Sequence, residues 1–291
     1  MNILRKVKTK IINFTMDSFE KIHKKRLRKK KYYSYNLYLY NLALHGMGVL
    51  NYENSEVSGE KYLLENLLKN APEHSVVIDV GANVGNYAKK CMEINSTISL
   101  IAFEPHPKTF FQLKAVSEVN GFRAINKGCG EENDTLLIYD YAENNGSSHA
   151  SLYEGVIENI HQAKKISTEV QIIKMDDFAT KEKIDHIYLL KIDTEGHELS
   201  VLKGIKALIE KQCIDYIQFE FNEMNTISKT FLRDFSEILN DYKFYRLLSD
   251  GVVPVGENTG YNSYLFEIFA FQNILAVRKD LVNNNELLFK D

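Results

Sequence analysis

The sequence predicts an α/β domain built on a doubly wound, mostly parallel sheet with helices on both faces. Short apolar runs rich in β-branched residues alternate with helical segments between residues 75 and 128, and the alternation returns after residue 186. These runs are apolar at consecutive positions, as expected of strands that are covered on both faces. Strands that alternate with helices are joined by right-handed crossovers and form one layered sheet.

The first half of the domain shows this pattern most clearly. A helix is expected at 58–70, where Ser58 stands near the N-cap and leucines recur on one face. The elements expected after it are strand 75–81, helix 84–94, strand 97–104, helix 107–120 and strand 122–128.

The segment 129–175 interrupts the alternation. Two runs in it, 136–141 and 170–175, predict paired edge strands around a polar loop, which we interpret as an insertion on the same sheet. The elements expected after it are strand 186–193, helix 197–211, strand 214–221, helix 226–241 and terminal strands near 243–248 and 274–279.

Length and composition indicate one large core with a small extension. At 291 residues, 44% of them hydrophobic, the chain is expected to form a domain at 58–291 that follows a basic helical extension at 1–57. Three well-separated cysteines without C-x-x-C spacing argue against a disulfide framework or a zinc site. They favour a reducing compartment, so we expect a cytoplasmic protein.

The charge of the chain is unevenly distributed. Residues 1–31 carry twelve lysines and arginines against two acids, a net charge of +10, whereas the remainder carries 24 basic and 37 acidic residues, a net charge of −13. Apolar residues recur at helical spacing among these lysines, the pattern of a basic amphipathic helix. They are Leu4, Val7, Ile11, Phe14 and Ile22.

Two interpretations of this basic segment stay open. It would attract anionic lipid at the inner face of a membrane or another acidic partner, nucleic acid being the least favoured, or it would be a solvated tail. No apolar run reaches the length of a membrane span, and charges interrupt any secretory signal.

Polar residues or glycines follow the apolar runs of the expected sheet. In an open α/β sheet, ligands bind outside the carboxyl ends of the strands, where the strand order reverses. The residues at these ends are Asp79 with Gly81, Glu104, Gly128, Asp193 with Glu195, and Glu220 with Asn222.

The turn after the first expected strand indicates a nucleoside cofactor. Gly81 permits a tight turn, and Gly85 permits close packing of helix on strand. Asn83 replaces the glycine that would let a pyrophosphate approach the backbone, which disfavours NAD or FAD. Glu104, 23 positions after Gly81, has the spacing of an acid that binds both hydroxyls of an adenosine ribose.

The stretch HIYLLKIDTEGHE, residues 186–198, allows three interpretations. Its acids and histidine would suit a catalytic cluster or a Mg²⁺ or Mn²⁺ site, the metal being less favoured because these positions need not converge across a glycine turn. Glu198 is also placed to favour the start of a helix by its charge alone.

Four motifs in this order resemble the FkbM family of S-adenosylmethionine-dependent methyltransferases. They are DVGANVG at 79–85, FEPHPKTFFQLKAVSEVNG at 103–121, LLKIDTEGHELSVLKGIKALI at 189–209 and FEFN at 219–222, with a GSS element at 146–148. The resemblance implies a class I methyltransferase fold, a Rossmann-like sheet of seven strands whose last strand is antiparallel. It also implies O-methylation of hydroxyl groups on sugars and natural products.

The resemblance also implies roles for individual residues. The methionine end of the cofactor would lie among Asp79, Gly81, Asn83 and Gly85. Glu104 would hold the ribose, Pro105 would shape the pocket beside it, and the adenine would lie near Lys127, Gly128 and Cys129. Asp193 would stand beside the transferable methyl group.

Transfer of a methyl group to a hydroxyl requires close positioning and a base for the hydroxyl proton. Asp193 or His197 is expected to be that base, with Glu195 ordering the loop or the acceptor. The acceptor-binding residues expected are Ser147, Ser148, Glu220 and Asn222.

The resulting hypothesis is an O-methyltransferase acting on a sugar, glycan, glycolipid or similar polyhydroxylated acceptor. A nicotinamide-dependent oxidoreductase and a non-catalytic module that docks through the basic extension are the alternatives. The sequence does not constrain the oligomeric state.

Overall fold

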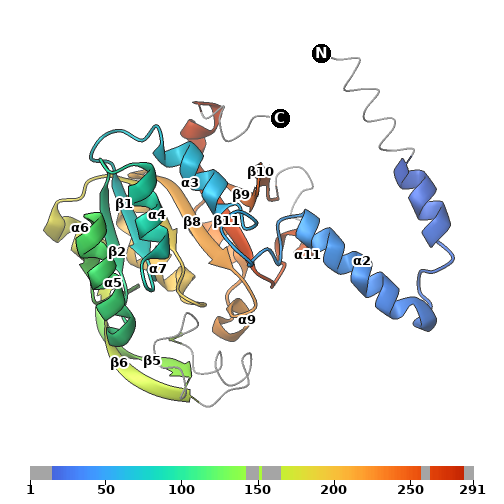
Figure 1. Ribbon diagram of the computed structural model, residues 1–291, viewed down its shortest axis with the longest axis horizontal. Helices are drawn as coiled ribbons and strands as arrows, with labels where there is room; N and C mark the ends of the chain where they lie inside the picture. Colours follow the sequence, from blue (N-terminus) through green and yellow to red (C-terminus); the bar gives the residue numbers. More distant parts are fainter. Residues whose placement is uncertain (1–14, 142–150, 153–164, 257–262, 285–291) are drawn as a thin grey trace. The chain divides into compact units, whose positions relative to one another are not determined.

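The computed structural model describes residues 15–141, 151–152, 165–256 and 263–284, and its contacts divide the chain into two compact units (Figure 1). The first unit is Met1–Met47 and the second is Gly48–Asp291. The described part of the first unit is helical at 15–23, at the 3-10 turn η1 (Lys30–Tyr32) and at α2 (Tyr33–Gly46). Among the described helices of both units, none combines the length and the apolar character needed to cross a membrane.

The second unit is built on an eight-stranded sheet with the order β10-β9-β11-β8-β7-β1-β2-β3. Its strands are β1 (Val76–Val80), β2 (Ser99–Phe103), β3 (Arg123–Ile125), β7 (Ile187–Ile192), β8 (Ile214–Phe221), β9 (Tyr242–Leu248), β10 (Gly251–Pro254) and β11 (Gln272–Arg278). Neighbouring strands of this sheet pair in parallel from β3 through β2, β1 and β7 to β8, and β11 is antiparallel to both β8 and β9. The sheet confirms the predicted α/β class, with β10 as an unpredicted edge strand that forms a hairpin with β9.

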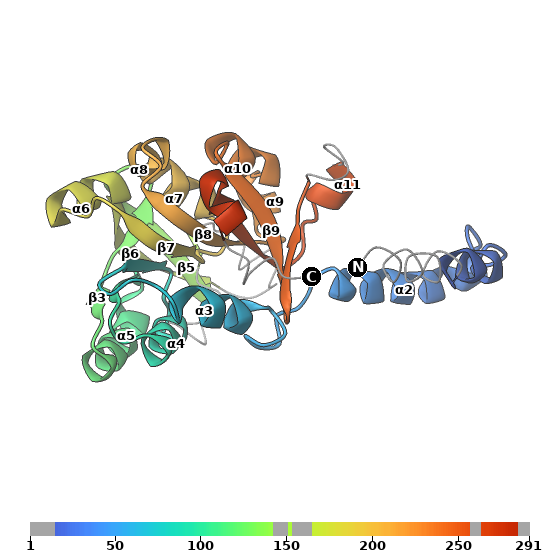
Figure 2. The ribbon, with the colours of Figure 1, turned by 90° about the horizontal axis from the view of Figure 1, so that it is seen from above.

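Helices cover both faces of this sheet (Figure 2). One face carries α3 (Glu60–Leu68), α4 (Asn86–Ile94) and α5 (Pro107–Asn120). The other carries α6 (Met175–Glu182), α7 (Glu198–Gly204), α8 (Lys206–Glu210) and α10 (Leu232–Ile238). Three short helical elements complete the described part of this unit: α9 (Asn225–Ser228), α11 (Ser263–Phe266) and η3 (Lys279–Asn284).

Each strand supplies apolar side chains to both layers, because successive side chains of a strand point to opposite faces. In β1, Val77 packs with the α3, α4 and α5 layer, whereas Ile78 packs with the α6, α7, α8 and α10 layer. Leu189 and Leu190 of β7 divide in the same way. Burial on both faces explains why these strands are continuous apolar runs.

Contrary to the sequence prediction, the described strands of the insertion at 129–175 do not lie on the main sheet. The segments expected at 136–141 and 170–175 do pair as antiparallel strands, β5 (Asp134–Tyr141) and β6 (Lys165–Lys174), but they belong to a separate three-stranded sheet with β4 (Gly128–Gly130). The expected strand 122–128 is therefore divided between two sheets. Gly128 and Gly130 permit this change, because a Cβ on either would lie within 3 Å of the Ile172 side chain in β6.

Two long helices expected from the sequence are each divided. The helix expected at 197–211 breaks at Ile205, next to Gly204, where a Cβ would lie 1.9 Å from the carbonyl oxygen of Gly130. The helix expected at 226–241 becomes α9 and α10, because Lys229 adopts a left-handed φ of 57° that ends α9.

The N-cap expected near Ser58 is weak. Ser58 stands two residues before α3, and its Oγ lies 3.5 Å from the Glu60 amide, a long contact for a cap.

The topology identifies where a ligand would bind. The chain runs from β1 to β2 and β3 on one side, and β7 and β8 lie on the other side of β1. The strand order therefore reverses between β1 and β7, and a crevice is expected at their carboxyl ends. Gly81 follows β1 and Asp193 follows β7, so both lie at this position.

Candidate active site

The turn after β1 brings two backbones together. Gly81 has a φ of +82°, and a Cβ on it would lie 1.7 Å from the carbonyl oxygen of Asp193, so only glycine fits. Asn83 adopts a left-handed φ of 50°, which asparagine tolerates better than most residues. Gly85 serves packing, since a Cβ there would lie 2.8 Å from Leu113 Cδ1 in α5.

Glu104 follows β2 and ties this turn to the next one. One carboxylate oxygen accepts a hydrogen bond from the amide of Asn83 (3.0 Å), and the other accepts one from the amide of His106 (2.8 Å). Burial raises the pKa of Glu104 to about 7, although both hydrogen bonds act in the opposite direction. The carboxylate is thus held in one orientation by backbone groups.

A cavity of about 580 Å³ opens at the strand ends, a size typical of small-molecule sites. It brings together most of the residues that the sequence analysis selected. These are Gly81, Asn83, Glu104, Pro105, Gly128, Asp193, Glu195, His197, Glu220 and Asn222. Cys129 also lines it, whereas Ser147 and Ser148 lie outside the described residues.

A second cavity of about 250 Å³ lies against the same turn. Asp79 lines this second cavity together with Glu60 and Lys191. Gly81, Asn83 and Asp193 line both cavities, so the turn and the end of β7 form their common wall.

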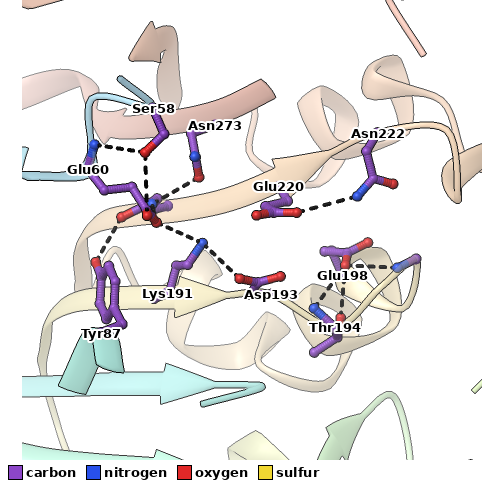
Figure 3. A network of polar contacts seen from close by, with 12 residues as sticks. Ser58, Glu60, Tyr87, Lys191, Asp193, Thr194, Glu198, Glu220, Asn222 and Asn273 are labelled. Carbon is purple, nitrogen blue, oxygen red and sulfur yellow. Dashed lines mark hydrogen bonds and ion pairs between the residues drawn. The ribbon is translucent and has the colours of Figure 1, made fainter. Parts of the chain in front are cut away.

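A buried lysine of β7 organises the second cavity (Figure 3). Lys191 is 2% exposed, and its Nζ lies 3.3 Å from Glu60 Oε1 and 3.4 Å from Asp193 Oδ2. Burial is the largest single influence and opposes its charge, but the neighbouring acids together outweigh burial and raise the pKa of Lys191; they are Asp193, Glu60, Glu220 and Asp79. Lys191 therefore stays positively charged and supplies the counter-charge to carboxylates from β7 and α3.

Amide and hydroxyl groups extend this network across the sheet. Gln218 of β8 donates to Glu60 Oε1 (2.8 Å) and to Asn273 Oδ1 of β11 (3.0 Å), and it accepts a hydrogen bond from the hydroxyl of Tyr87 (2.8 Å). This network was not predicted from the sequence. One signal in the sequence could have revealed the ion pair between Lys191 and Asp193. Lys191 lies inside an apolar run, and it precedes Asp193 by two residues, which places both side chains on the same face of the strand.

Asp79 has a carboxylate oxygen that the network does not use. The residue is 1% exposed, and its Oδ2 has no hydrogen-bond partner among the described residues. Burial raises the pKa of Asp79 to about 7, although Lys191 acts to lower it. A buried acceptor beside a cavity has the chemistry to receive a cationic donor from a ligand.

The loop after β7 is ordered by Glu198. Its Oε1 accepts hydrogen bonds from the amides of Thr194 and Gly196 (both 3.0 Å) and from the Thr194 hydroxyl (3.1 Å) (Figure 3). Glu195 then adopts a left-handed φ of 54°, and its carbonyl accepts a hydrogen bond from Ser151 (2.7 Å). Glu198 therefore shapes the loop that carries Asp193 and Glu195.

The ionisable groups that line the larger cavity differ in their preferred charge. Burial lowers the pKa of His197 to about 4, so its imidazole is neutral at neutral pH. Burial and then the charge of Asp193 raise the pKa of both Glu195 and Glu220. Asn222 lies beside Glu220, with its Nδ2 3.4 Å from Glu220 Oε2.

The sequence leaves a divalent metal at these acids as a less favoured alternative. Within the described residues, no group of three or more histidine, cysteine, aspartate or glutamate side chains is arranged to hold a metal ion. The acids at the strand ends are instead distributed along the cavity wall.

Comparison with known proteins places this arrangement in a family. The profile of the methyltransferase FkbM domain matches residues 79–245, which include Glu104, Asp193 and Glu220. A relative named hexuronic acid methyltransferase AglP, of Haloferax volcanii, is 29% identical over 171 residues, 57% of this chain and 64% of the relative. The 2-O-methyltransferase NoeI of Sinorhizobium fredii is 22% identical over 161 residues, 51% of this chain and 65% of the relative. The chain thus spans slightly less than two thirds of the length of these relatives.

The chain is also similar to solved structures of methyltransferases. A SAM-dependent methyltransferase from Agrobacterium tumefaciens is 7% identical with a TM-score of 0.42, covering 78% of this chain and 63% of that one. A putative methyltransferase of Streptococcus mutans in complex with SAH is 11% identical with a TM-score of 0.40, covering 76% of this chain and 97% of that one. Because the family profile covers more than half of the sequence, the chain belongs to the FkbM family of methyltransferases.

Proposed function

We propose that this protein transfers a methyl group from S-adenosylmethionine to a hydroxyl of a sugar or similar polyhydroxylated acceptor. The observation that carries the proposal is the position of Asp193, which lines both cavities at the strand-order reversal of an FkbM domain. The names of two relatives, a hexuronic acid methyltransferase and a 2-O-methyltransferase, support a sugar acceptor. The nicotinamide alternative has no such support.

The residues present fit the cofactor at two points. Glu104 offers the free lone pairs of a fixed carboxylate to the two ribose hydroxyls. Asp79 offers its unused Oδ2 to the ammonium group of the methionine end. Gly81 and Asn83, which separate the two cavities, would lie along the cofactor, with Pro105 and Gly128 beside the adenosine. When bound, the cofactor supplies an electrophilic methyl group.

The chain itself must position the acceptor hydroxyl and take its proton. We propose Asp193 for this role, because its side chain is 33% exposed and Lys191 balances its charge from the buried side. His197 lines the same cavity and is the second candidate for the base, and burial lowers its pKa to about 4, so its imidazole is neutral at neutral pH. If Asp193 is the base, His197 would act as a neutral hydrogen-bonding group, and Glu195 would orient the acceptor.

A comparison of Asp193→Asn with Asp185→Asn tests the assignment. Asp185 is an exposed acid before β7, so its variant controls for the lost charge. Methyl transfer from radiolabelled cofactor to p-nitrophenyl glycosides should fall by roughly 100-fold or more in Asp193→Asn, the usual contribution of a general base. Binding of S-adenosylhomocysteine should change only a few-fold. Full activity in Asp193→Asn would remove Asp193 from the mechanism.

We also propose that the first unit binds an anionic membrane surface and that the protein works in the cytoplasm. Met16, Phe19 and Ile22, spaced three residues apart on a helix, are 64%, 52% and 63% exposed, and the basic run 24–31 follows them. Exposed apolar side chains beside lysines are typical of helices that lie in a lipid interface. The free thiols of Cys91, Cys129 and Cys213 are consistent with a reducing compartment.

Sedimentation with vesicles tests this second proposal. The full chain should bind vesicles that contain phosphatidylglycerol and not vesicles of phosphatidylcholine alone, and Lys24→Glu/Lys25→Glu should abolish the binding. Lys203→Glu/Lys206→Glu makes the same charge change on the second unit and should bind as the wild type does. Equal binding to both vesicle types, or none, would contradict a role for the basic run.

A further inference from the structure

The larger cavity is acidic along much of its wall. Five of its lining residues are acids: Glu104, Asp193, Glu195, Glu220 and Glu223. No described residue that lines it is a lysine or an arginine, and its one described histidine, His197, is neutral. Lys191, whose charge acts to lower the pKa of Glu195 and Glu220, is paired with Glu60 and Asp193 and does not line this cavity.

The acidic residues of this wall repel one another electrostatically, and they would repel an anionic ligand in the same way. Burial raises the pKa of Glu195, and Asp193, Glu198 and Glu223 raise it further by repulsion. Burial is the larger cause of this raised pKa, and only the part that comes from the neighbouring acids reports a negative potential at Glu195. A carboxylate brought in by an acceptor would meet the same repulsion, with no described arginine or lysine on the wall to pair with it.

The same cavity carries an aromatic pair at its wall. Tyr52 and Phe271 both line it, with ring centroids 6.0 Å apart and planes at 83°. Tyr52 is 67% exposed, and its segment is held in place because the amide of Leu50 donates to the Phe271 carbonyl (2.8 Å). An exposed ring beside polar groups provides a surface for the C–H face of a sugar, whose hydroxyls then reach the polar groups.

Both aromatic residues lie outside the segment that defines the family. The profile covers residues 79–245, so Tyr52 precedes it and Phe271 follows it. The segment matched by the family profile therefore supplies the acids at the strand ends, whereas the flanking segments of this chain supply the aromatic surface.

Resting on the proposed function, we infer that the acceptor is an uncharged sugar ring packed on Tyr52 and Phe271, and that acidic sugars are excluded. Its hydroxyls would meet Glu220, Asn222 and Glu195. This specificity differs from that named for the hexuronic acid relative.

Matched acceptors test the inference directly. Calorimetry of the S-adenosylhomocysteine complex with p-nitrophenyl glucoside and p-nitrophenyl glucuronide, which differ in one carboxylate, should show at least roughly 10-fold tighter binding of the glucoside. The ratio of kcat/KM for methyl transfer should favour the glucoside by a similar factor. Glu220→Gln/Glu223→Gln should narrow the gap, because it removes two acidic groups from a wall that has no described lysine or arginine.

A second set of variants tests the aromatic surface. Tyr52→Ala should weaken glucoside binding about 10-fold while leaving binding of S-adenosylhomocysteine unchanged, and Tyr52→Phe should retain the affinity, since the ring and not the hydroxyl carries the contact. Tyr38→Ala, on an exposed tyrosine of the first unit, is the control and should bind as the wild type does.

The outcomes separate this inference from the proposed function. Equal or better use of the glucuronide would overturn the inference and leave the methyltransferase intact. Unchanged glucoside affinity in Tyr52→Ala would overturn the role of the aromatic pair. Transfer to neither sugar by a protein that binds S-adenosylhomocysteine would overturn the proposed acceptor class, and the inference with it.

Discussion

The two sides of the crevice use acids in different ways. On the β1 and β2 side, each oxygen of Glu104 accepts a hydrogen bond from a backbone amide, so the carboxylate is fixed before any ligand arrives. On the β7 and β8 side, Glu195 and Glu220 face other acids, and repulsion adds to burial in raising the pKa of each. The first side is preorganised for one ligand, whereas binding on the second side depends on the charge of the ligand that enters.

Lys191 lies between these two sides of the crevice. Its ion pairs with Glu60 and Asp193 let a buried strand end carry negative charge towards both cavities. Burial of an acid is therefore tolerated here through fixed amides on one side and through a buried cation on the other.

The largest effect is expected where the two sides touch. Gly81→Ala places a Cβ 1.7 Å from the Asp193 carbonyl oxygen at a φ of +82°, so the turn after β1 must move away from β7. We expect a loss of about 4 kcal/mol in the free energy of unfolding, measured by urea denaturation. Gly121→Ala is the matched control, because Gly121 has a φ of +78° and nothing within 4 Å, and it should cost only about 1 kcal/mol. Equal losses would mean that backbone contact does not couple the two strand ends.

The next effect tests the buried cation. Lys191→Met removes the positive charge from Glu60 and Asp193, and breaking a buried pair in this way costs about 3–5 kcal/mol. Lys203→Met, at an exposed pair with Glu131, should cost less than about 1 kcal/mol. A small cost for Lys191→Met at pH 8 would show that the acids do not depend on it.

A smaller effect concerns the pH dependence of stability. Burial raises the pKa of Asp79 from 3.8 to about 7, so the folded state holds a proton that the unfolded state has released. Its contribution to stability is therefore lost as pH rises from about 4 to about 7, with a slope of at most about 1.4 kcal/mol per pH unit. Asp79→Asn should flatten the pH profile of the unfolding free energy in this window. Parallel profiles for wild type and variant would show that Asp79 stays ionised.

Much of this arrangement could be predicted from local sequence. Glu104, Asp193 and Glu220 each end an apolar run, and parallel strands place such ends along one edge of the sheet, so their convergence followed from topology. The Lys191 network could be predicted only in part. Lys191 and Asp193 are two residues apart on one strand, but Glu60 comes from a helix distant in sequence, and only the folded chain brings it there.

Other features depend on tertiary contacts that the sequence does not display. The second sheet forms because Gly128 and Gly130 fit against Ile172, and the pairing of β4 with β6 spans a long insertion. Tyr52 and Phe271 lie at opposite ends of the domain and carry no motif, so their meeting at one cavity could not be read locally.

The most direct test compares one acid from each side of the crevice. Calorimetric binding of S-adenosylhomocysteine is measured at pH 8 for the wild type, Glu104→Gln and Glu220→Gln. The wild type should bind, Glu104→Gln should bind at least roughly 10-fold more weakly because a charged acceptor is lost, and Glu220→Gln should bind like the wild type. Wild-type affinity should also fall as pH drops below about 7, where Glu104 and Asp79 take up protons, and the affinity of Glu104→Gln should fall less, because only Asp79 then titrates in this range. Unchanged affinity in Glu104→Gln, or an equal loss in Glu220→Gln, would contradict the division of the crevice into a cofactor side and an acceptor side.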